Sequence, residues 1–196
     1  MKGFGYALEK RWDQMTDEQR TIMLRGIVHD ADRMDTIVRQ LIDAARVVGG
    51  RLELFRERTD LPDLVLAIAD QQRRDPDHPP VEWVGSATDA LVDPSRLRTT
   101  ILAFIESLVW WCTDGPIRVD ARLASGWLSV RASRAGVDLT SEQADGLFLP
   151  RQPGTGAGSK IGLFVARAVA EAQGGRAWGE VTDGRLVFHV ELPAES

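Results

Sequence analysis

The sequence predicts an α+β protein: a helical hairpin that forms a dimeric four-helix bundle, followed by an α/β sandwich with a mixed sheet and helices on one face. Two observations support this fold class. A coiled-coil seam runs along the helix expected after Thr16, and a glycine pair at 49–50 ends that helix. Beyond the glycines, short alternating segments typical of strands are interleaved with three apolar helical segments. We therefore divide the 196 residues into a dimerisation hairpin at 1–50 and a sandwich domain at 51–196.

The hairpin is expected to start with a short helix at 1–12, in which Phe4 and Leu8 lie one turn apart. Thr16 and Gln19 have the spacing of a capping box, which marks the start of the second helix. The apolar residues of the second helix then alternate in spacings of four and three, as they do in a coiled coil. They are Ile27, Ala31, Met34, Val38, Leu41 and Ala45.

This seam is the predicted dimer interface. A helix of roughly 30 residues with a single apolar stripe is not stable alone in water. The short first helix can cover only part of the stripe, so the simplest completion is a homodimer in which two hairpins form a four-helix bundle. The alternative is a single long helix that lies on its own globular domain.

The sandwich domain is expected to alternate strands and helices. Asp60 and Asp93 are suited to cap the two helices that follow them, and Asp183-Gly184 is suited to a tight turn between the last two strands. A glycine-rich loop is expected at 150–158. The expected elements are strands at 51–58, 81–84, 117–122, 127–132, 177–181 and 185–192, and helices at 61–72, 94–111 and 161–172.

Composition excludes several classes of protein. Apolar residues make up 43% and charged residues 27% of the chain, as in ordinary globular domains. The net charge of −5 gives no general attraction to nucleic acid. Cys112 is the only cysteine, which rules out a disulfide within the chain and fits a reducing compartment. No apolar run approaches the roughly 20 residues that span a bilayer. We expect a cytoplasmic chain without a membrane segment; if the protein is a sensor, its sensing part is not in this chain.

Several segments, in a fixed order, resemble a known family. They are residues 30–34, 41–43 and 49–54, the helix at 93–111, the run at 158–167 with the glycine pair at 174–175, and the closing 190–193. In this order they resemble the second dimerisation helix, the asparagine box, the last glycine box and the last strand of bacterial sensor histidine kinases. The resemblance covers essentially the whole chain, and it implies a GHKL-type sandwich of the Bergerat fold after the hairpin.

The resemblance also implies a chemistry. In that family a histidine on the first bundle helix takes the γ-phosphate of Mg-ATP and passes it to an aspartate of a response regulator. In this chain the first residues, Lys2-Gly3-Phe4, resemble the stretch that follows the phosphoacceptor. Either the gene starts further upstream or the protein lacks that histidine, and both alternatives stay open.

The asparagine box departs from the family pattern. Ala103 and Ser107 stand where the resemblance places two asparagines, the second of which helps to hold Mg²⁺. A serine hydroxyl is a poorer ligand for a hard cation than an amide carbonyl. Glu106 matches a residue common at the presumed general-base position. The apolar run 109–111, with two tryptophans, is expected either to fill the nucleotide space or to pack in the core.

The glycine boxes are altered as well. The run 132–136 resembles Asp-x-Gly-x-Gly, with Ala132 in place of the adenine-binding aspartate and Arg134 in place of a glycine. An alanine cannot accept the hydrogen bond of the adenine amino group. The last glycine box is better preserved, although Lys160 replaces a glycine. The nucleotide-binding residues that the resemblance implies for this degenerate site are Ser107, Gly136, Gly156, Gly158, Lys160 and Gly162.

These departures support a first hypothesis, a non-catalytic (pseudokinase) homodimer that binds a response regulator or a partner kinase, with no cofactor and no metal. The second hypothesis is an active sensor histidine kinase that uses Mg-ATP and whose phosphoacceptor region is missing from this chain. A third is a phosphotransfer protein that uses His29, which Asp30 follows as a possible base. For His29 the ordinary alternative is a solvent-facing helical histidine. A fourth hypothesis, without the family, is a structural dimer.

Overall fold

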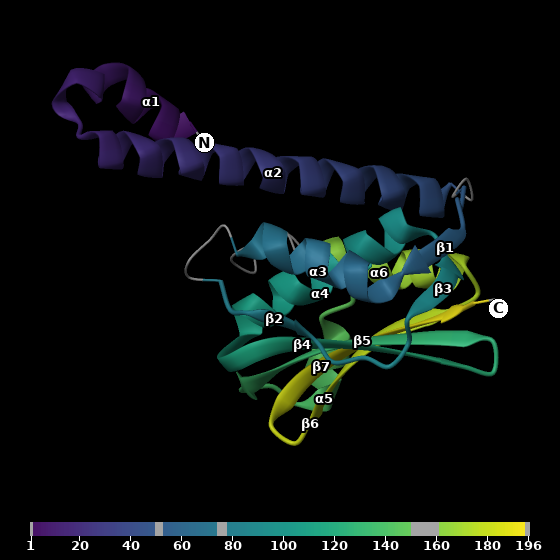
Figure 1. The fold of residues 1–196 in the computed structure, drawn as a ribbon. Helices are drawn as coiled ribbons and strands as arrows, with labels where there is room; N and C mark the ends of the chain where they lie inside the picture. Colours follow the sequence, from purple (N-terminus) through teal and green to yellow (C-terminus); the bar gives the residue numbers. More distant parts are fainter. Residues whose placement is uncertain (1, 50–52, 74–77, 150–160, 195–196) are drawn as a thin grey trace. The chain divides into compact units, whose positions relative to one another are not determined.

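The computed structural model describes residues 2–49, 53–73, 78–149 and 161–194 (Figure 1). It divides into two compact units, residues 1–40 and 41–196, and each is described by itself. The boundary between the units falls inside one long helix, ten residues before the boundary at 50 that the sequence suggests. The functional division at residue 50 therefore stays a prediction.

The first unit is a helical hairpin, as expected. Helix α1 (Lys2–Arg11) is followed by the short 3-10 helix η1 (Trp12–Gln14) and by α2 (Asp17–Val48), a helix of 32 residues. The two helices pack closely at Gly26, where an added Cβ atom would lie 2.9 Å from a ring carbon of Phe4. A glycine at this position lets the aromatic ring of α1 lie against the backbone of α2.

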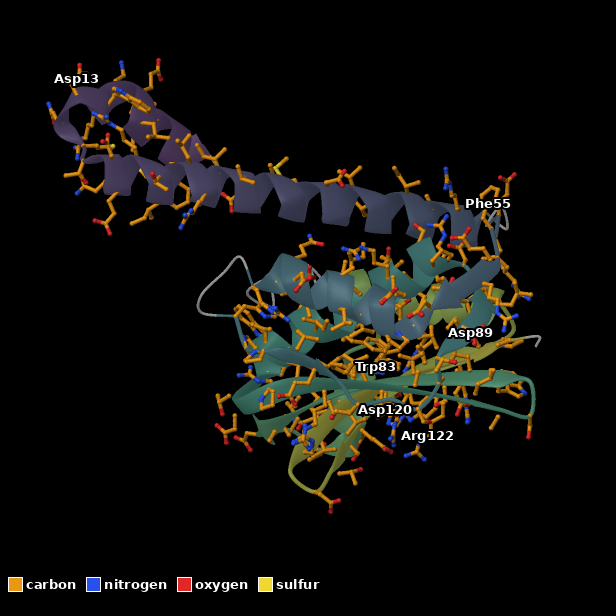
Figure 2. All side chains as sticks on the ribbon, viewed as in Figure 1. Asp13, Phe55, Trp83, Asp89, Asp120 and Arg122 are labelled. Carbon is orange, nitrogen blue, oxygen red and sulfur yellow. The ribbon has the colours of Figure 1, made fainter. Side chains whose placement is uncertain are left out.

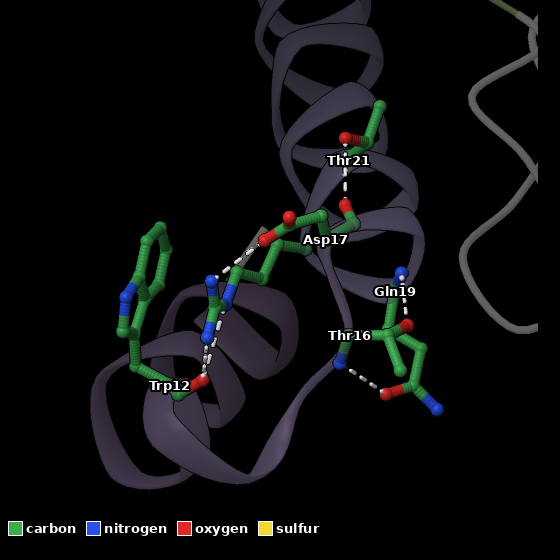
Figure 3. A network of polar contacts seen from close by, with 6 residues as sticks. Trp12, Thr16, Asp17, Gln19 and Thr21 are labelled. Atoms are coloured by element: carbon green, nitrogen blue, oxygen red, sulfur yellow. Dashed lines mark hydrogen bonds and ion pairs between the residues drawn. The ribbon is translucent and has the colours of Figure 1, made fainter.

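Polar side chains hold the turn of the hairpin (Figure 3). The Thr16 amide donates to Gln19 Oε1 at 3.0 Å, and the Gln19 amide donates to Thr16 Oγ1 at 3.2 Å, which confirms the capping box. The guanidinium of Arg20 donates to the Trp12 carbonyl from Nε at 3.1 Å and from Nη2 at 2.8 Å, and to Asp17 Oδ1 from Nη1 at 2.8 Å. Arg20 thereby ties the start of α2 back to the end of the turn.

The second unit is a sandwich with a five-stranded mixed sheet, which confirms the predicted architecture. Helices α3 (Leu61–Gln72), α4 (Pro94–Trp111) and α6 (Ile161–Ala172) cover one face of this sheet (Figure 1). In spatial order the strands are β2 (Val81–Trp83), β4 (Cys112–Ala124), β5 (Trp127–Val137), β7 (Arg185–Pro193) and β6 (Arg176–Thr182). Strand β2 is parallel to β4, and the other neighbours are antiparallel.

Local signals start α3 and α4 at the residues that the sequence predicts. The Asp60 side chain accepts a hydrogen bond from the Asp63 amide at 2.8 Å, and Asp93 accepts one from the Arg96 amide at 3.1 Å. Each aspartate therefore satisfies a backbone donor that the first turn of a helix leaves unpaired. Pro94 at the first helical position needs no such partner.

The strands expected at 51–58, 117–122 and 127–132 have other limits in the structure, and two elements were not expected. The strand expected at 51–58 is shorter and begins later, as β1 (Glu57–Asp60), while residues 53–56 lie outside any strand and 51–52 lie outside the described residues. Within the described residues its one ladder partner is the four-residue β3 (Asp89–Val92), which sets its length and which the sequence had not suggested. A short helix, α5 (Ser141–Gly146), was also not expected, and it lies against β6.

The core lies between the sheet and its helices. Alternate residues of the central strands point into it and are fully buried, among them Val130 on β5 and Phe188 on β7. Phe104 from α4 packs against Phe188 with ring centroids 5.5 Å apart, and Phe148 contacts both rings. Each such aromatic side chain contributes about 1.5–3 kcal/mol by leaving water. The aromatic cluster thus fixes α4 on the sheet.

The other face of the sheet carries polar and charged residues. One row crosses four strands, with Asp120 on β4, Arg131 on β5, His189 on β7 and Trp178 on β6 as direct neighbours in the ladders. Arg131 Nε donates to both carboxylate oxygens of Asp120 at 3.1 Å. Asp120 is labelled on this open face in Figure 2. The row matches the alternation expected of a sheet with only one covered face.

Candidate functional site

The candidate site starts on α4, the helix that resembles the asparagine box. Ala103 is buried in the core, Ser107 one turn later is half-buried, and Glu106 is exposed. The helix therefore presents a single short hydroxyl where the family pattern has two amides. A hydroxyl at this position can accept a hydrogen bond, but it is a weak ligand for a magnesium ion. No cluster of three or more metal-ligating side chains occurs in the parts of the chain that the structure describes.

The two tryptophans that end α4 have different surroundings. Trp111 is half-buried and packs against the core cluster, as the core interpretation expects. Trp110 is 58% exposed, so it neither packs in the core nor fills a closed space. The apolar run at the end of this helix is therefore split between a structural residue and a surface residue.

Strand β5 carries the residues that resemble the first glycine box. The side chain of Ala132 is 0% exposed and points to the face of the sheet that the helices cover, between Val119 on β4 and Phe188 on β7. Its surroundings are apolar core, and its methyl group offers no acceptor. This position therefore offers no hydrogen-bond acceptor to a ligand.

Arg134 lies two residues further along the same face of β5 and is only 9% exposed. Its Nε donates to the Gly115 carbonyl at 3.0 Å, its Nη1 to the Cys112 carbonyl at 2.6 Å and its Nη2 to the Thr113 carbonyl at 3.3 Å. Its hydrogen-bond partners in the described residues are thus three backbone carbonyls just after the end of α4. The residue that replaces a glycine of the family pattern is a buried cation that joins two elements.

The retained glycine of this box has a structural role. Gly136 has φ +78°, and an added Cβ atom would lie 2.6 Å from Thr113 Oγ1 and 2.8 Å from the Asp114 amide nitrogen. Strands β4 and β5 therefore approach each other here closely enough that only a glycine fits. The ladder between the strands is also irregular here, with a register shift between Asp114 and Arg118.

Cys112 follows α4 directly and is buried. Burial raises the pKa of its thiol to about 11, and the charge of Arg134 opposes this rise only in part. The thiol is therefore protonated near neutral pH and is neither a nucleophile nor a metal ligand.

The last glycine box is described only in part. Gly156, Gly158 and Lys160 lie outside the described residues, while Gly162 lies in the first turn of α6 and is buried. Further along this helix, Arg167 Nε donates to the Ala177 carbonyl at 2.8 Å, and its guanidinium forms an ion pair with Asp145. These contacts join α6 to β6 and α5, and they fix the position of the helix within the second unit.

The remaining candidates are not brought into this site by what the structure describes. His29 lies on α2, in the first unit, and its side chain is outside the described residues. Its phosphotransfer role stays a prediction. None of the helices in the described ranges combines the length and apolar character that a membrane crossing requires.

One pocket of the second unit lies at the other end of α4. It has a volume of about 190 Å³ and is lined by Phe55, Glu57, Asp93, Pro94, Ser95 and Arg96. At its edge the Phe55 amide donates to Asp93 Oδ2 at 3.0 Å. Phe55 is labelled in Figure 2. The pocket contains none of the predicted nucleotide residues, and the sequence had pointed to none of its residues except the Asp93 cap and Pro94.

Comparison with known proteins agrees with this fold. No family model matches the chain. It is 27% identical over 210 aligned positions to the sensor protein PfeS of Pseudomonas aeruginosa, covering 92% of this chain and 46% of PfeS. It is 25% identical to the sensor protein GacS of Pseudomonas syringae pv. syringae, covering 93% of this chain and 22% of GacS. The chain thus spans less than half the length of these relatives.

Solved structures show the same fold at low sequence identity. The histidine kinase AdeS of Acinetobacter baumannii matches with a TM-score of 0.71 and 18% identity, covering all of this chain and 95% of AdeS. The catalytic domain of the histidine kinase ThkA matches with a TM-score of 0.60 and 17% identity, covering 72% of this chain and 96% of that domain. The predicted succession of a hairpin and a sandwich of this type is therefore confirmed.

Proposed function

We propose that the chain, which is similar to sensor proteins and shares the fold of histidine kinases, is a histidine kinase-like, non-catalytic and dimeric module of two-component signalling. In this role it binds a response regulator or a partner kinase and does not transfer phosphate from ATP. The observation that carries the proposal is on β5. A buried methyl group, Ala132, and a buried guanidinium, Arg134, occupy the positions that resemble the adenine-binding aspartate and a glycine.

The adenine side of the site supports this proposal. A carboxylate that accepts from the adenine amino group gives such a site its selectivity, and its loss leaves that donor without a partner. The surroundings of Ala132 are apolar on both neighbouring strands. Neither neighbour offers another acceptor, so an adenine ring brought here would bury an unpaired polar group.

The metal side supports it independently. Mg²⁺ prefers oxygen ligands in near-octahedral geometry and binds together with the phosphates of the nucleotide. On α4 the asparagine positions are held by Ala103, which is buried in the core, and by Ser107, which carries only a hydroxyl. The side chains on this helix therefore do not match the donor set that Mg-ATP needs. For this reason we assign no step through the nucleotide.

The dimer part of the proposal is supported by the seam on α2. Met34, Val38 and Leu41 are 53%, 51% and 50% exposed, although they are apolar and lie in line with one another. Helix α1 has ten residues against 32 in α2, so it is too short to cover the whole stripe. Burial of such a stripe against a second copy stabilises both chains by about 25 cal/mol for each Å² removed from water.

Binding of Mg-ATP tests the non-catalytic role directly. A ligand at 100 times its dissociation constant adds about 2.7 kcal/mol of stability, which raises the melting temperature visibly. We expect no shift in the melting temperature and no binding heat at millimolar Mg-ATP. A clear, magnesium-dependent shift would overturn the proposal and favour an active kinase.

The second candidate is that active sensor histidine kinase. Two observations favour it: Glu106 is exposed on α4, and Gly136 keeps its left-handed conformation. The test mixes the purified chain with radiolabelled ATP and a matching second chain that carries a phosphoacceptor histidine. Transfer of label that the change Glu106→Gln reduces strongly would support this candidate, and no transfer would leave the non-catalytic role.

A further inference from the structure

Arg134 is an unusual residue for its position, because it is a buried cation on the covered face of a sheet. We infer that Arg134 closes the adenine end of the degenerate nucleotide site from within, by joining β5 to the end of α4. This inference rests on the proposed non-catalytic function and names the residue that makes the site inaccessible. In this inference the Arg134 side chain fills the space that the adenine base would need.

The first argument is one of space. Side chains two residues apart on a strand point to the same face and lie about 7 Å from each other. Ala132 and Arg134 form such a pair, and both point to the covered face. An adenine ring held from position 132 would therefore lie along the strip that runs towards position 134. A glycine at 134 would leave the covered face open beside position 132, whereas the buried arginine side chain fills the face at 134 and reaches the segment 112–115, which lies opposite residues 135–137.

The second argument is one of hydrogen bonds. The chain leaves α4 at Cys112, which has an extended backbone (φ −123°, ψ 144°) and is also the first residue of β4. Cys112 is the C-cap of α4, and its carbonyl accepts from Arg134 at 2.6 Å. The guanidinium is thus stabilised by backbone dipoles, and it completes the end of α4. Movement of this side chain towards solvent would leave the buried Cys112 carbonyl without this donor, which is costly.

The third argument is the shape of β4 around the guanidinium. The carbonyls of Cys112, Thr113 and Gly115 converge on one side chain because the strand is irregular here and Gly115 has φ +70°. Gly136 on β5 lets the same segment approach closely. The backbone of this corner is therefore built around Arg134.

Restoring the family residues tests the inference. The variants are Ala132→Asp, Arg134→Gly and the double change, and the probe is ADP, titrated by calorimetry with and without Mg²⁺. We expect no binding by the wild type or by Ala132→Asp, where Arg134 still fills the strip. We expect the double variant to bind ADP at least about ten times more tightly than any binding that can be detected for Ala132→Asp.

The outcomes separate this inference from the proposed function. Binding of ADP by the wild type contradicts the non-catalytic proposal, whatever the variants do. If the wild type does not bind, equal affinities of Ala132→Asp and the double variant overturn the role of Arg134. A folded double variant that does not bind overturns it as well. Arg131→Gly is the matched control, because it removes an arginine from the open face of the same strand and is expected to leave ADP binding unchanged.

A second measurement keeps the inference testable if the double variant does not fold. Free guanidinium ion, at concentrations far below those that denature, has the same donors as the side chain that Arg134→Gly removes. We expect it to raise the melting temperature of Arg134→Gly but not that of Arg131→Gly, with sodium at equal ionic strength as the reference. The absence of a specific rise would contradict the carbonyl-bound position of this guanidinium.

Discussion

The imidazole ring of His189 lies flat on the indole of Trp178, with centroids 4.5 Å apart and planes 3° from parallel. His189 Nε2 also lies 3.1 Å from Glu180 Oε1 on the neighbouring strand. Although it is on the open face of the sheet, His189 is buried by the side chains around it. A titratable group is thereby held in the centre of the sheet.

This arrangement predicts the pH dependence of stability. Burial lowers the pKa of His189 below its usual 6.5, and the charge of Arg131 acts in the same direction, whereas Glu180 and Glu191 oppose the shift. Because the folded pKa lies below the unfolded one, the stabilising contribution is full above about pH 6.5 and is lost as the pH falls through the folded pKa.

The change His189→Gln tests this prediction, since glutamine does not titrate. We expect the stability of the wild type to fall more steeply than that of the variant between about pH 7 and about pH 5, as measured by urea unfolding. His78→Gln is the control, because His78 lies outside the sheet and its Nδ1 lies 2.8 Å from the Pro79 carbonyl. Parallel pH profiles for the wild type and His189→Gln would contradict the assignment.

Arg134→Met is predicted to destabilise the second unit. Methionine fills similar space but makes no hydrogen bonds, so the carbonyls of Cys112, Thr113 and Gly115 at the start of β4 lose this donor. The expected loss is about 2–4 kcal/mol in the free energy of unfolding. Arg131→Met removes a partly exposed ion pair with Asp120 and should cost at most about 1 kcal/mol. Equal losses from the two changes would mean that the buried contacts of Arg134 add little.

Gly136→Ala is predicted to be costly for two reasons, the positive φ and the contacts with the 113–114 segment. Gly184 has φ +68° with nothing within 4 Å of an added Cβ, so Gly184→Ala isolates the cost of the backbone conformation. We expect about 1–2 kcal/mol for Gly184→Ala and clearly more for Gly136→Ala, measured by thermal or urea unfolding. Equal costs would show that β4 can yield to the added methyl group.

Val38→Glu is predicted to break the proposed dimer. The side chain lies on the seam of α2 and is 51% exposed in the single chain, so a charge there would be buried without a partner in a bundle. We expect a shift from dimer to monomer in light scattering coupled to size exclusion. Ile22→Glu is the matched control, because Ile22 is an exposed β-branched residue of the same helix and lies off the seam. A monomeric wild type would remove the basis of this prediction.

Arg20→Ala is predicted to loosen the turn between α1 and α2. The change removes two hydrogen bonds to the Trp12 carbonyl and one to Asp17, and also the stacking of the guanidinium 4.7 Å from the Trp12 ring. Because these groups are exposed, the expected effect is a faster amide exchange at residues 12–20, worth about 1 kcal/mol. Arg25→Ala on the same helix is the control and should leave this exchange unchanged.

The sequence by itself determined the elements whose ends carry their own signals. The limits of α3, α4 and α6 were predicted to the residue, because aspartate caps, a proline and terminal glycines act within one turn. The last strand pair was also predicted, since Asp183-Gly184 permits the positive φ of its turn. The capping box of Thr140 and Gln143 is a signal for α5 that can be read in the sequence.

Only the tertiary structure decided the features that depend on partners distant in the chain. The limits of β1 follow from its pairing with β3, about 30 residues later, so its own residues could not reveal them. The losses at Ala103, Ser107 and Ala132 were readable as missing functional groups. The contacts of Arg134 could not be read from the sequence. Its three acceptors come from a segment about 20 residues away that meets β5 only when the sheet is formed.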